Sequence, residues 1–509
     1  MAMSPLAVSK LLPCKEGMFD VVIFDEASQI KPEDAITSIY RGRQLVVAGD
    51  RFQLPPTSFG EKTIEEDVKY WSEETEESLD PATSGMESIL TSAIGIFSQD
   101  RNIKPLRLHY RSNDERLIAW SNFHIYRKAG EELFTFPSLD VESHSSLRYN
   151  YLPNVKTQSM SVANEAEIQK VKEVVLEHID SQPQLSLGII AFGMRHSIRL
   201  QDEFNILEKE NDAFYEWKQS FAEKREKFFI KNIERVQGDE RDAIIISPGY
   251  APNLDGNVPL QFGSLNRQGG ERRLNVAASR SKEYMHLVTS MRSSDIDLKR
   301  SKSSSIALFR SFLEFMENQG RLIEAEYEFG APTTPFEEEI LQKLSDAGLT
   351  VDCQVGDSGF KIDFAIRDPK TNRYLLAIEA DGATYHSSEY ARERDYMRQR
   401  ILEGRGWRFV RIWSTDWWVN PDLEVQRVLN ALQSSPASAK SSSQKVPVVK
   451  AKISKKYEDI EEYKILRGIR DQNQGWSKEA IFELWYKSMG FQRKTQNLVN
   501  RFNNYWRDF

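Results

Sequence analysis

The chain of 509 residues has only two cysteines, Cys14 and Cys353. Two isolated cysteines exclude a disulfide-stapled scaffold and a four-cysteine zinc site, and they are typical of a reducing cytoplasm. The sequence also lacks any apolar run of the ~18–20 residues that a membrane-spanning helix needs. The first residues, Met1 to Pro5, show no basic-then-apolar signal peptide. We therefore expect a cytoplasmic protein with no membrane partner.

Hydrophobic residues make up 40% of the sequence and charged residues 28%, which is enough apolar material for ordinary cores. A chain of this length is expected to form three or four domains. The net charge is −8, but it is unevenly distributed. Glu61–Asp80 holds nine acidic residues against two lysines, whereas Pro436–Lys456 holds six lysines and no acid. An acidic insert and a basic linker on a near-neutral body are compatible with nucleic-acid binding.

Short apolar runs bounded by polar turns predict the buried strands of a parallel sheet. They lie at Phe19–Phe24, Gln44–Ala48, Leu187–Ala191, Ala243–Ser247 and Met285–Thr289. Helical patterns at 85–97, 164–179 and 195–210 alternate with them. This alternation predicts βαβ units and an α/β fold.

The first apolar run ends in two adjacent carboxylates, Asp25 and Glu26. In nucleotide hydrolysis, one such acid can hold Mg²⁺ and the next can orient or deprotonate the attacking water. An isolated acid pair after a strand is more often a solvated loop. The interpretation therefore depends on the blocks that follow it.

Four further blocks follow in order: Gly49–Pro56, Leu108–Ser112, Val236–Asp242 and Arg272–Lys282. With Asp25-Glu26-Ala27, they resemble motifs II to VI of superfamily 1 helicases, in the branch with a DEA-type second motif. The resemblance covers residues 3–295 and implies two RecA-like P-loop NTPase lobes. Residues 3–8 also resemble an internal segment of larger bacterial helicases.

The resemblance assigns roles to individual residues. Gln53 is expected to contact the γ-phosphate of ATP and the attacking water, and Arg111 and Arg280 to reach that phosphate from the second lobe. A guanidinium suits this role because it forks onto phosphate oxygens. The alternative for each arginine is a surface ion pair. Gln237, Gly238 and Glu240 are expected near the nucleotide sugar and the nucleic-acid groove, where Gly238 also suits a tight turn.

One element of ATP binding is missing from the sequence. A P-loop reads G-x-x-x-x-G-K-[ST], and neither Gly-Lys-Ser nor Gly-Lys-Thr occurs in the 509 residues. Only 24 residues precede Asp25, so the chain is expected to begin inside the first lobe. Its own ATP affinity should therefore be weak, and a separate chain or an upstream segment is the expected source of the P-loop.

A second acidic constellation lies between residues 333 and 432. Asp363 stands in an alternating apolar run, and Glu379 and Asp381 end another. Carboxylates that point the same way from neighbouring strands can bind the Mg²⁺ needed for phosphodiester cleavage. His386 follows closely enough to act as a base or to position water. Solvated strand ends and a loop histidine are the alternative interpretations.

This stretch resembles the PD-(D/E)XK nucleases, and within them the branch related to the very-short-patch-repair endonucleases. The matching pieces are Pro335–Glu337, Ile362–Phe364, Ile378–Gly382 with His386, Arg392–Asp395 with Arg398, and Gly406–Ser414. Asp381 replaces the usual lysine of the ExK triplet, and it can be a ligand, an orienting group or a structural cap. Arg394 and Arg398, four residues apart on a predicted helix, either hold phosphate or pair with Glu393 or Asp395.

The expected organisation is α/β throughout, with a helical end. Residues 1–104 are a partial first RecA-like lobe with an acidic insertion at 61–80, and 105–300 are the second lobe. A helical connector (301–332), an endonuclease domain (333–432), a basic linker (433–456) and an aromatic helical module (457–509) follow. The last is either a docking domain or a helix-turn-helix-like module.

These features predict most of the motor of an ATP-dependent DNA helicase fused to a Mg²⁺-dependent endonuclease, acting on DNA rather than RNA in defence or repair. The alternative is a nucleic-acid-binding scaffold without ATPase activity, in which at most the nuclease works.

Overall fold

The computed structural model describes most of the chain up to residue 433 and part of the C-terminal end. The described residues are 2–56, 88–97, 102–141, 146–157, 162–322 without 259, 268 and 302, then 332, 334–356, 361–381, 389–433, 466, 469, 478–488, 502 and 506. They fall into two compact units, Met1–Ser435 and Pro436–Phe509. The acidic insertion at 61–80, His386 and the basic linker beyond residue 433 lie outside the described residues.

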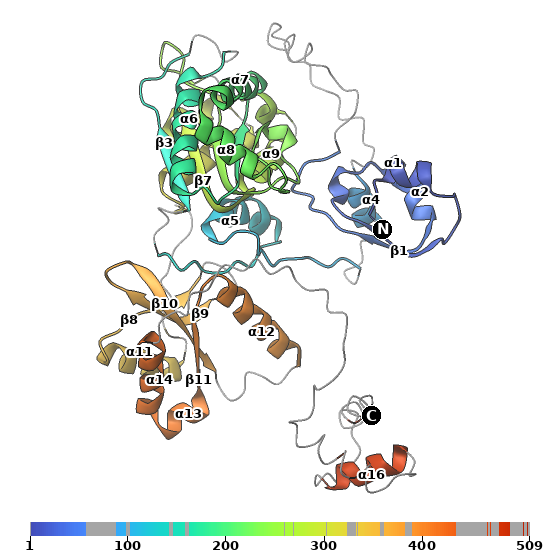
Figure 1. The fold of residues 1–509 in the computed structure, drawn as a ribbon, viewed down its shortest axis with the longest axis vertical. Helices are drawn as coiled ribbons and strands as arrows, with labels where there is room; N and C mark the ends of the chain where they lie inside the picture. Colours follow the sequence, from blue (N-terminus) through green and yellow to red (C-terminus); the bar gives the residue numbers. More distant parts are fainter. Residues whose placement is uncertain are drawn as a thin grey trace. The chain divides into compact units, whose positions relative to one another are not determined.

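The largest body, here called the second lobe (residues 102–322), is built on a five-stranded parallel sheet (Figure 1). Its strands are β3 (Leu147–Tyr151), β4 (Leu187–Ala191), β5 (Phe229–Asn232), β6 (Arg241–Ser247) and β7 (Ser281–Thr289), in the order β3-β7-β6-β4-β5. The strands predicted at 187–191, 243–247 and 285–289 are all present, two of them with longer N-terminal ends. The strands β4, β6 and β7 are buried on both faces over most of their length, as the continuous apolar runs predicted, whereas β3 at the edge is partly exposed.

Helices cover both faces of this sheet. Ile189 and Ile245 pack against α6 (Glu165–Ser181), α7 (Met194–Glu210) and α8 (Asp212–Ser220). Alternate residues such as Ile190 and Ile246 face the opposite layer. That layer contains α5 (Arg116–Ser121), α9 (Gly270–Ala278) and α10 (Ser304–Glu317).

A buried carboxylate joins α6 to two strand ends of this sheet. Asn164 caps α6 by accepting a hydrogen bond from the backbone N–H of Glu167 at 3.2 Å. The fully buried Glu167 accepts further hydrogen bonds from the Ser247 hydroxyl, the Asn164 amide and the backbone N–H groups of Gly249 and Ser290. Burial raises the pKa of Glu167 to about 7 although these donors favour its charged form. The network fixes the chain where it leaves β6 and β7.

The described residues of the first lobe, 2–56 and 88–97, contain one βαβ unit. Strand β1 (Phe19–Phe24) lies parallel to β2 (Gly42–Val47), and α2 (Pro32–Tyr40) connects them. The lobe also contains α1 (Pro5–Leu11), the short helix η1 (Ala27–Gln29) and α4 (Ile89–Ile96), for which Ser88 is the N-cap. Side chains on one face of the sheet, such as Phe24 and Val47, pack under α2 and α4.

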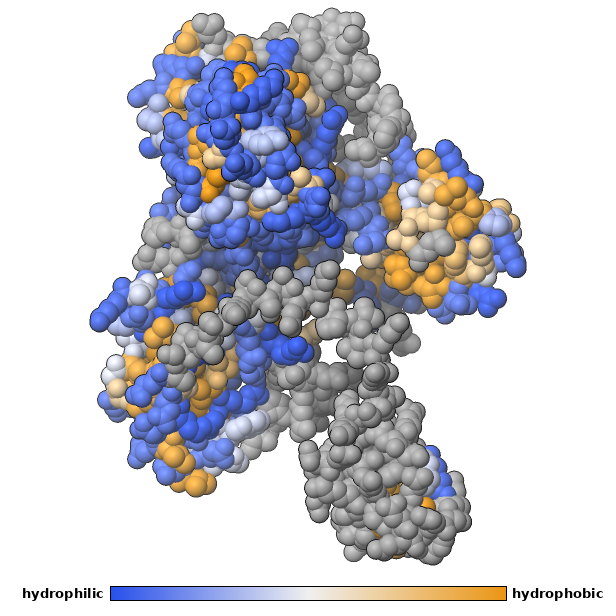
Figure 2. Space-filling view, viewed as in Figure 1, coloured by the Kyte–Doolittle hydropathy of each residue, from blue (hydrophilic) through white to orange (hydrophobic). Residues whose placement is uncertain are grey.

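The other face of this two-stranded sheet is apolar but exposed. Val21, Ile23 and Val46 share that face by register and are 44%, 66% and 46% exposed. Figure 2 shows hydrophobic surface over this lobe, which carries the labels α1, α2 and β1 in Figure 1. Parallel sheets are normally covered on both faces, so this face has the character of an interface.

The third domain (residues 334–433) has a four-stranded mixed sheet in the order β11-β10-β9-β8. Strands β8 (Thr350–Val355) and β9 (Ile362–Asp368) pair antiparallel, as do β9 and β10 (Arg373–Asp381). Strand β11 (Phe409–Trp413) pairs parallel with β10. The helices α11 (Pro335–Asp346), α13 (Ser414–Val419) and α14 (Pro421–Gln433) cover one face, and α12 (Glu389–Gly404) lies on the other (Figure 1).

Residues 134–141, here called the strap, connect the second lobe to the third domain. The Phe134 N–H donates to the Arg107 carbonyl at 2.7 Å, and the Tyr374 N–H donates to the Leu139 carbonyl at 2.8 Å. The indole of Trp407 donates to the Pro137 carbonyl at 3.0 Å, and Phe136 is buried among side chains of β9, β10 and α12. The strap therefore packs against both the second lobe and the third domain.

The terminal unit is described at fewer positions. Helix α16 spans Lys478–Ser488, and the buried Trp485 and Phe502 pack together with ring centroids 5.4 Å apart. The aromatic residues at the end of the sequence thus form a small core of their own. Among the described residues of the whole chain, no helix has the length and apolarity to cross a bilayer.

Buried neutral histidines in the second lobe predict that acid destabilises it. Burial lowers the pKa of His196 to about 4 and that of His286 to about 3, from 6.5. The unfolded chain therefore takes up protons first. The two histidines contribute fully to the free energy of unfolding above pH 6.5. As the pH falls below 6.5 this contribution decreases, by at most about 1.4 kcal/mol per histidine per pH unit. Urea denaturation from pH 7 to 4.5 measures this slope.

The combined variant His196→Gln and His286→Gln should flatten that pH slope, whatever it does to stability at neutral pH. His124→Gln is the control, because His124 is partly exposed. An unchanged slope in the double variant would show that other groups cause the acid sensitivity.

Candidate functional site

The acid pair of the first lobe lies at the end of β1 in a strained backbone. Glu26 has a φ of 52° and a ψ of 40°, in the left-handed region that a residue with a Cβ rarely adopts. Its N–H donates to the Asp25 carboxylate at 3.0 Å, which holds the turn. Both side chains are exposed. Strain of this kind is typical of functional turns, where it aims side chains.

The block Val236–Asp242 of the second lobe reaches this acid pair. The Gln237 amide donates to the Glu26 carboxylate at 3.3 Å and lies 3.5 Å from the Ser28 hydroxyl. Gly238 follows with a φ of 79°, so the turn that carries Gln237 requires glycine. Two blocks that lie 211 residues apart in the sequence thus meet.

Gln53 lies in a loop that the second lobe holds in place. Its amide donates to the Asp50 carboxylate at 3.1 Å, and the Tyr126 hydroxyl donates to the same Asp50 oxygen at 2.6 Å. The amide of the buried Asn275, on α9, donates to the Phe52 carbonyl at 3.0 Å. Leu54 packs into the core of the second lobe.

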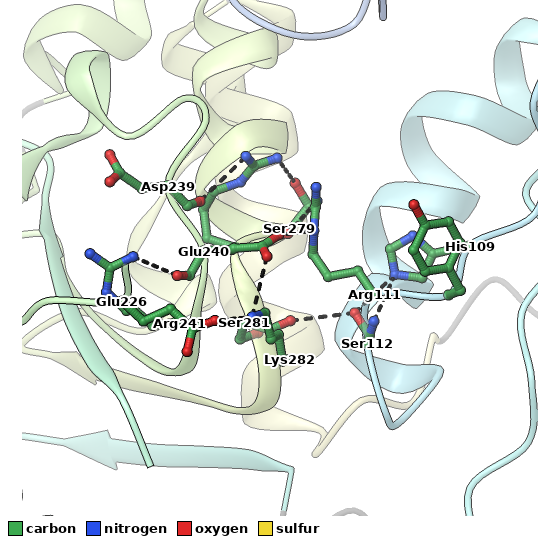
Figure 3. Close-up of polar contacts among 12 residues, drawn as sticks. His109, Arg111, Ser112, Glu226, Asp239, Glu240, Arg241, Ser279, Ser281 and Lys282 are labelled. Carbon is green, nitrogen blue, oxygen red and sulfur yellow. Dashed lines mark hydrogen bonds and ion pairs between the residues drawn. The ribbon is translucent and has the colours of Figure 1, made fainter. Parts of the chain in front are cut away.

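Arg111 extends from the loop of His109 and Ser112 toward the strand ends of the second lobe (Figure 3). Its guanidinium donates to the Glu240 carboxylate at 2.8 Å and to the Ser279 carbonyl at 3.4 Å. Partial burial opposes the charge of Glu240, but Lys282 and Arg111 outweigh it, so the pKa of Glu240 is lowered. Arg111 thus forms an ion pair, which is the alternative to phosphate contact that the sequence allowed.

Arg280 is a buried cation whose hydrogen bonds end on uncharged groups. It is only 2% exposed and donates to the carbonyls of Val276 and Asp239 and to the Ser279 hydroxyl. Burial, reinforced by the nearby Arg111, lowers the pKa of Arg280 to about 10. A buried cation whose hydrogen bonds end on uncharged groups gains from an anionic ligand, because burial of charge is costly.

His109 stays neutral between these arginines. Burial and the charges of Arg111, Arg405 and Arg280 lower the pKa of His109 to about 3. Its Nε2 atom therefore accepts a hydrogen bond from the Ser112 N–H at 3.3 Å. The ring fixes the loop that carries Arg111.

In the third domain, Asp363 and Glu379 face each other on β9 and β10. Phe364 pairs with Ile378, so Asp363 and Glu379 are opposite one position further along. The Ala380 N–H donates to Asp363 at 2.8 Å. Burial raises the pKa of Glu379 to about 7, with a further contribution from Asp363. Burial, opposed by the Ala380 N–H, also raises the pKa of Asp363.

Two arginines compensate these acids. The Arg398 guanidinium, on α12, lies 3.3 Å from the Glu379 carboxylate and also donates to the Lys361 carbonyl. Arg411, on β11, lies 2.7 Å from the Asp381 carboxylate. Arg398 therefore forms an ion pair with Glu379, a partner on another element that its helix spacing did not suggest. The contact with Arg411 favours an orienting or structural role for Asp381.

The carboxylates of Asp363 and Glu379 suit a divalent cation that takes few of its ligands from the protein. The residues that the structure describes contain no group of three or more His, Cys, Asp or Glu side chains arranged around a metal. Mg²⁺ is commonly held by one or two carboxylates and keeps several waters. Asp363 and Glu379 supply two such carboxylates, and their mutual repulsion favours a bound cation.

Two family models match the chain. Residues 86–292 match the AAA domain family AAA_12, and residues 336–432 match the family REase_MTES_1575. The chain joins a superfamily 1 helicase-type AAA domain to a restriction-endonuclease-like domain. The expected superfamily 1 helicase-type domain and the α/β fold class are thereby confirmed, and the second acidic constellation is confirmed as part of a restriction-endonuclease-like domain.

Relatives support the helicase-type part. The "Uncharacterized ATP-dependent helicase MG140 homolog" of Mycoplasma pneumoniae is 30% identical over 84% of this chain and 38% of its own length. The "Uncharacterized ATP-dependent helicase MG140" of Mycoplasma genitalium is 28% identical over the same shares. "DNA-binding protein SMUBP-2" of Rattus norvegicus is 24% identical over 55% of this chain and 25% of that protein. The chain thus spans under two fifths of the mycoplasma helicases.

Several residues of the helicase-type and nuclease-like domains were not singled out from the sequence. Asn275 lies inside the last helicase block, so the sequence could have singled it out, and its side chain is buried in the structure. Tyr126 and Arg405 stand outside every block and become visible only through the fold. Arg405 donates to the Tyr110 carbonyl at 3.1 Å, next to Arg111.

The Asn275→Ala variant should loosen the Gln53 loop of the helicase-type domain. It removes the hydrogen bonds from Asn275 to the Phe52 carbonyl and the Tyr126 hydroxyl. A buried hydrogen bond contributes about 1 kcal/mol, so amide hydrogen exchange in the loop should accelerate roughly fivefold. Exchange measured by mass spectrometry on peptides covering residues 49–56 tests this.

Gln201→Ala is the matched control, because Gln201 also donates to a backbone carbonyl of the same lobe, that of Ile230. It should leave exchange at 49–56 unchanged. Equal exchange in wild type and Asn275→Ala would mean that Leu54 packing alone holds the loop.

Proposed function

We propose that this chain is the C-terminal portion of an ATP-dependent superfamily 1 DNA helicase fused to a Mg²⁺-dependent DNA endonuclease. The observation that carries the helicase half is the meeting of Gln237 with Glu26, with Arg280 buried and supported by uncharged groups in the same lobe. The proposed organisation is that expected from the sequence, with the nuclease at 333–432. DNA rather than RNA, a PD-(D/E)XK site and a cytoplasmic location are parts of the same proposal.

In the ATPase half, each of the residues described above has a proposed role that agrees with its contacts. Asp25 would hold Mg²⁺, which neutralises phosphate charge when bound, and Glu26 would orient the attacking water. Gln53 would contact that water and the γ-phosphate. Arg111 and Arg280 would stabilise charge on the transferred phosphoryl group, with Arg111 leaving Glu240 to do so. Gln237 and Gly238 would adjoin the nucleotide sugar.

The phosphate cradle would come from another polypeptide segment. No P-loop sequence occurs in the chain, and the β1–β2 sheet exposes Val21, Ile23 and Val46 on one face. A further part of a parallel sheet with its helices is what such a face normally packs against. We propose that the segment carrying the P-loop covers it, either upstream or as a separate chain.

We expect the isolated chain to hydrolyse ATP at background rate and to gain turnover when a polypeptide carrying the P-loop half of a DEA-type lobe is added. In that complex, Arg111→Ala should lower turnover by ~10³-fold or more, the cost of losing such an arginine elsewhere. Arg280→Lys tests the buried position while keeping its charge. A coupled phosphate-release assay measures both.

Asp20→Asn is the control for this assay, because Asp20 is exposed and forms only a loose ion pair at 3.9 Å with Arg43. Robust Glu26-dependent turnover by the isolated chain would contradict the assignment. A complex that forms without turnover would favour a nucleic-acid-binding scaffold.

In the nuclease half, Asp363 and Glu379 would hold Mg²⁺, which activates water and stabilises charge on the phosphate when bound. Asp381, paired with Arg411, would orient the end of β10. His386 would act as a base or position the water. The support for this half is the pair of opposed carboxylates with raised pKa values on neighbouring strands.

Asp363→Asn and Glu379→Gln should each abolish Mg²⁺- or Mn²⁺-dependent DNA cleavage, because each removes one of two carboxylate charges on the metal. These substitutions keep side-chain size, so folding should survive. Plasmid nicking with and without EDTA, on the full chain, provides the measurement. His386→Ala should slow cleavage without abolishing Mn²⁺ binding.

Asp352→Asn is the matched control for the nuclease, since Asp352 lies on β8 and pairs with Arg367 at 2.9 Å. It should cleave like wild type. Nicking that persists in EDTA, or in the combined Asp363→Asn and Glu379→Gln variant, would place the nuclease site elsewhere.

A further inference from the structure

The Arg398 side chain occupies the carboxylate pair of the nuclease-like domain. It is the cation next to Glu379, at 3.3 Å, and its charge also acts on Asp363. Ala365 and Ala377 share the sheet face of these acids, so that face has small side chains where α12 packs. Arg398 thus contacts one of the two carboxylates that a bound metal would need.

The two arginine–carboxylate contacts of this site differ in length. Arg411 lies 2.7 Å from Asp381 and forms the shorter ion pair of the site. Arg398 lies 3.3 Å from Glu379 and shares its Nη2 atom with the Lys361 carbonyl. The longer ion pair is the one that a competing ligand can replace more readily.

The helix that carries Arg398 is anchored close to it. One turn further along α12, Leu402 is fully buried, and the Trp407 N–H donates to the Leu402 carbonyl at 3.0 Å. Trp407 in turn donates to the strap at Pro137. A change of partner at Arg398 is therefore a side-chain rotation on a fixed helix.

A cation bound by Glu379 and a guanidinium beside Glu379 repel each other. A DNA phosphate resolves this conflict, because guanidinium forms forked hydrogen bonds to phosphate oxygens. We propose that Arg398 exchanges partners, from Glu379 in the free protein to a DNA phosphate in the complex, and thereby makes metal binding and DNA binding mutually dependent. This inference rests on the proposed nuclease function and adds to it the order in which the site assembles.

The test is the effect of DNA on Mn²⁺ affinity, measured by electron paramagnetic resonance on the full chain at alkaline pH, where Glu379 is deprotonated. A short phosphorothioate duplex that resists cleavage serves as the DNA. In wild type, DNA should tighten Mn²⁺ binding about tenfold, within the usual range of coupling between sites. In Arg398→Gln this effect should disappear. Arg398→Lys should keep part of it, because the charge remains.

Arg400→Gln is the matched control, since Arg400 is an exposed arginine on the same helix. It should retain the tenfold effect, which separates partner exchange from general loss of positive charge. Full coupling in Arg398→Gln, or none in a wild type that binds both Mn²⁺ and DNA, would overturn the inference. Absence of Mn²⁺ binding that depends on Asp363 and Glu379 would overturn the proposed nuclease function, and this inference with it.

Discussion

Charge held in poorly solvated places is the constraint on which both halves of this chain depend. Glu167 is fully buried and is stabilised by donors from four groups of its own domain. Arg280 is as deeply buried, yet its hydrogen bonds end on neutral oxygens. Glu379 is paired with Arg398 at 3.3 Å, and its pKa stays raised. The first arrangement completes a fold, whereas the other two leave an electrostatic cost that a ligand of opposite charge can offset.

The strap shows how the two domains share structure. Its first residues pair with the segment that leads to Arg111, and its last residues pair with the turn before β10. Phe136 and Trp407 close the apolar space between them. The nuclease-like domain is therefore packed against the loop that carries a proposed catalytic arginine of the helicase-type domain.

Local patterns in the sequence predicted part of this fold, although not β3 (Leu147–Tyr151) or β5 (Phe229–Asn232). The apolar runs at 19–24 and 187–191 coincide with β1 and β4, because a buried parallel strand needs little beyond continuous hydrophobicity and polar ends. Asn164 and Ser88 cap helices as their residue types favour. The fold class also followed, because strands and helices alternate regularly.

Pairings between distant residues were beyond the reach of those patterns. Arg398 was expected either to bind phosphate or to pair with a neighbour on its own helix, since sequence spacing describes only one helix. Its contact with Glu379 depends on which sheet face α12 covers, and that follows from the small residues Ala365 and Ala377. The same holds for Tyr126, whose bond to Asp50 joins residues 76 apart.

The strained turn at Glu26 connects these arguments. A left-handed glutamate is costly, by about 1–3 kcal/mol, and persists only where its surroundings impose it. Asp25 holds the Glu26 N–H, and Gln237 approaches the side chain from the second lobe. A turn that served only to end β1 would have no need of this conformation, since glycine or asparagine adopts it more readily. The strained carboxylate at this position thus agrees with the proposed role of Glu26 in orienting the attacking water.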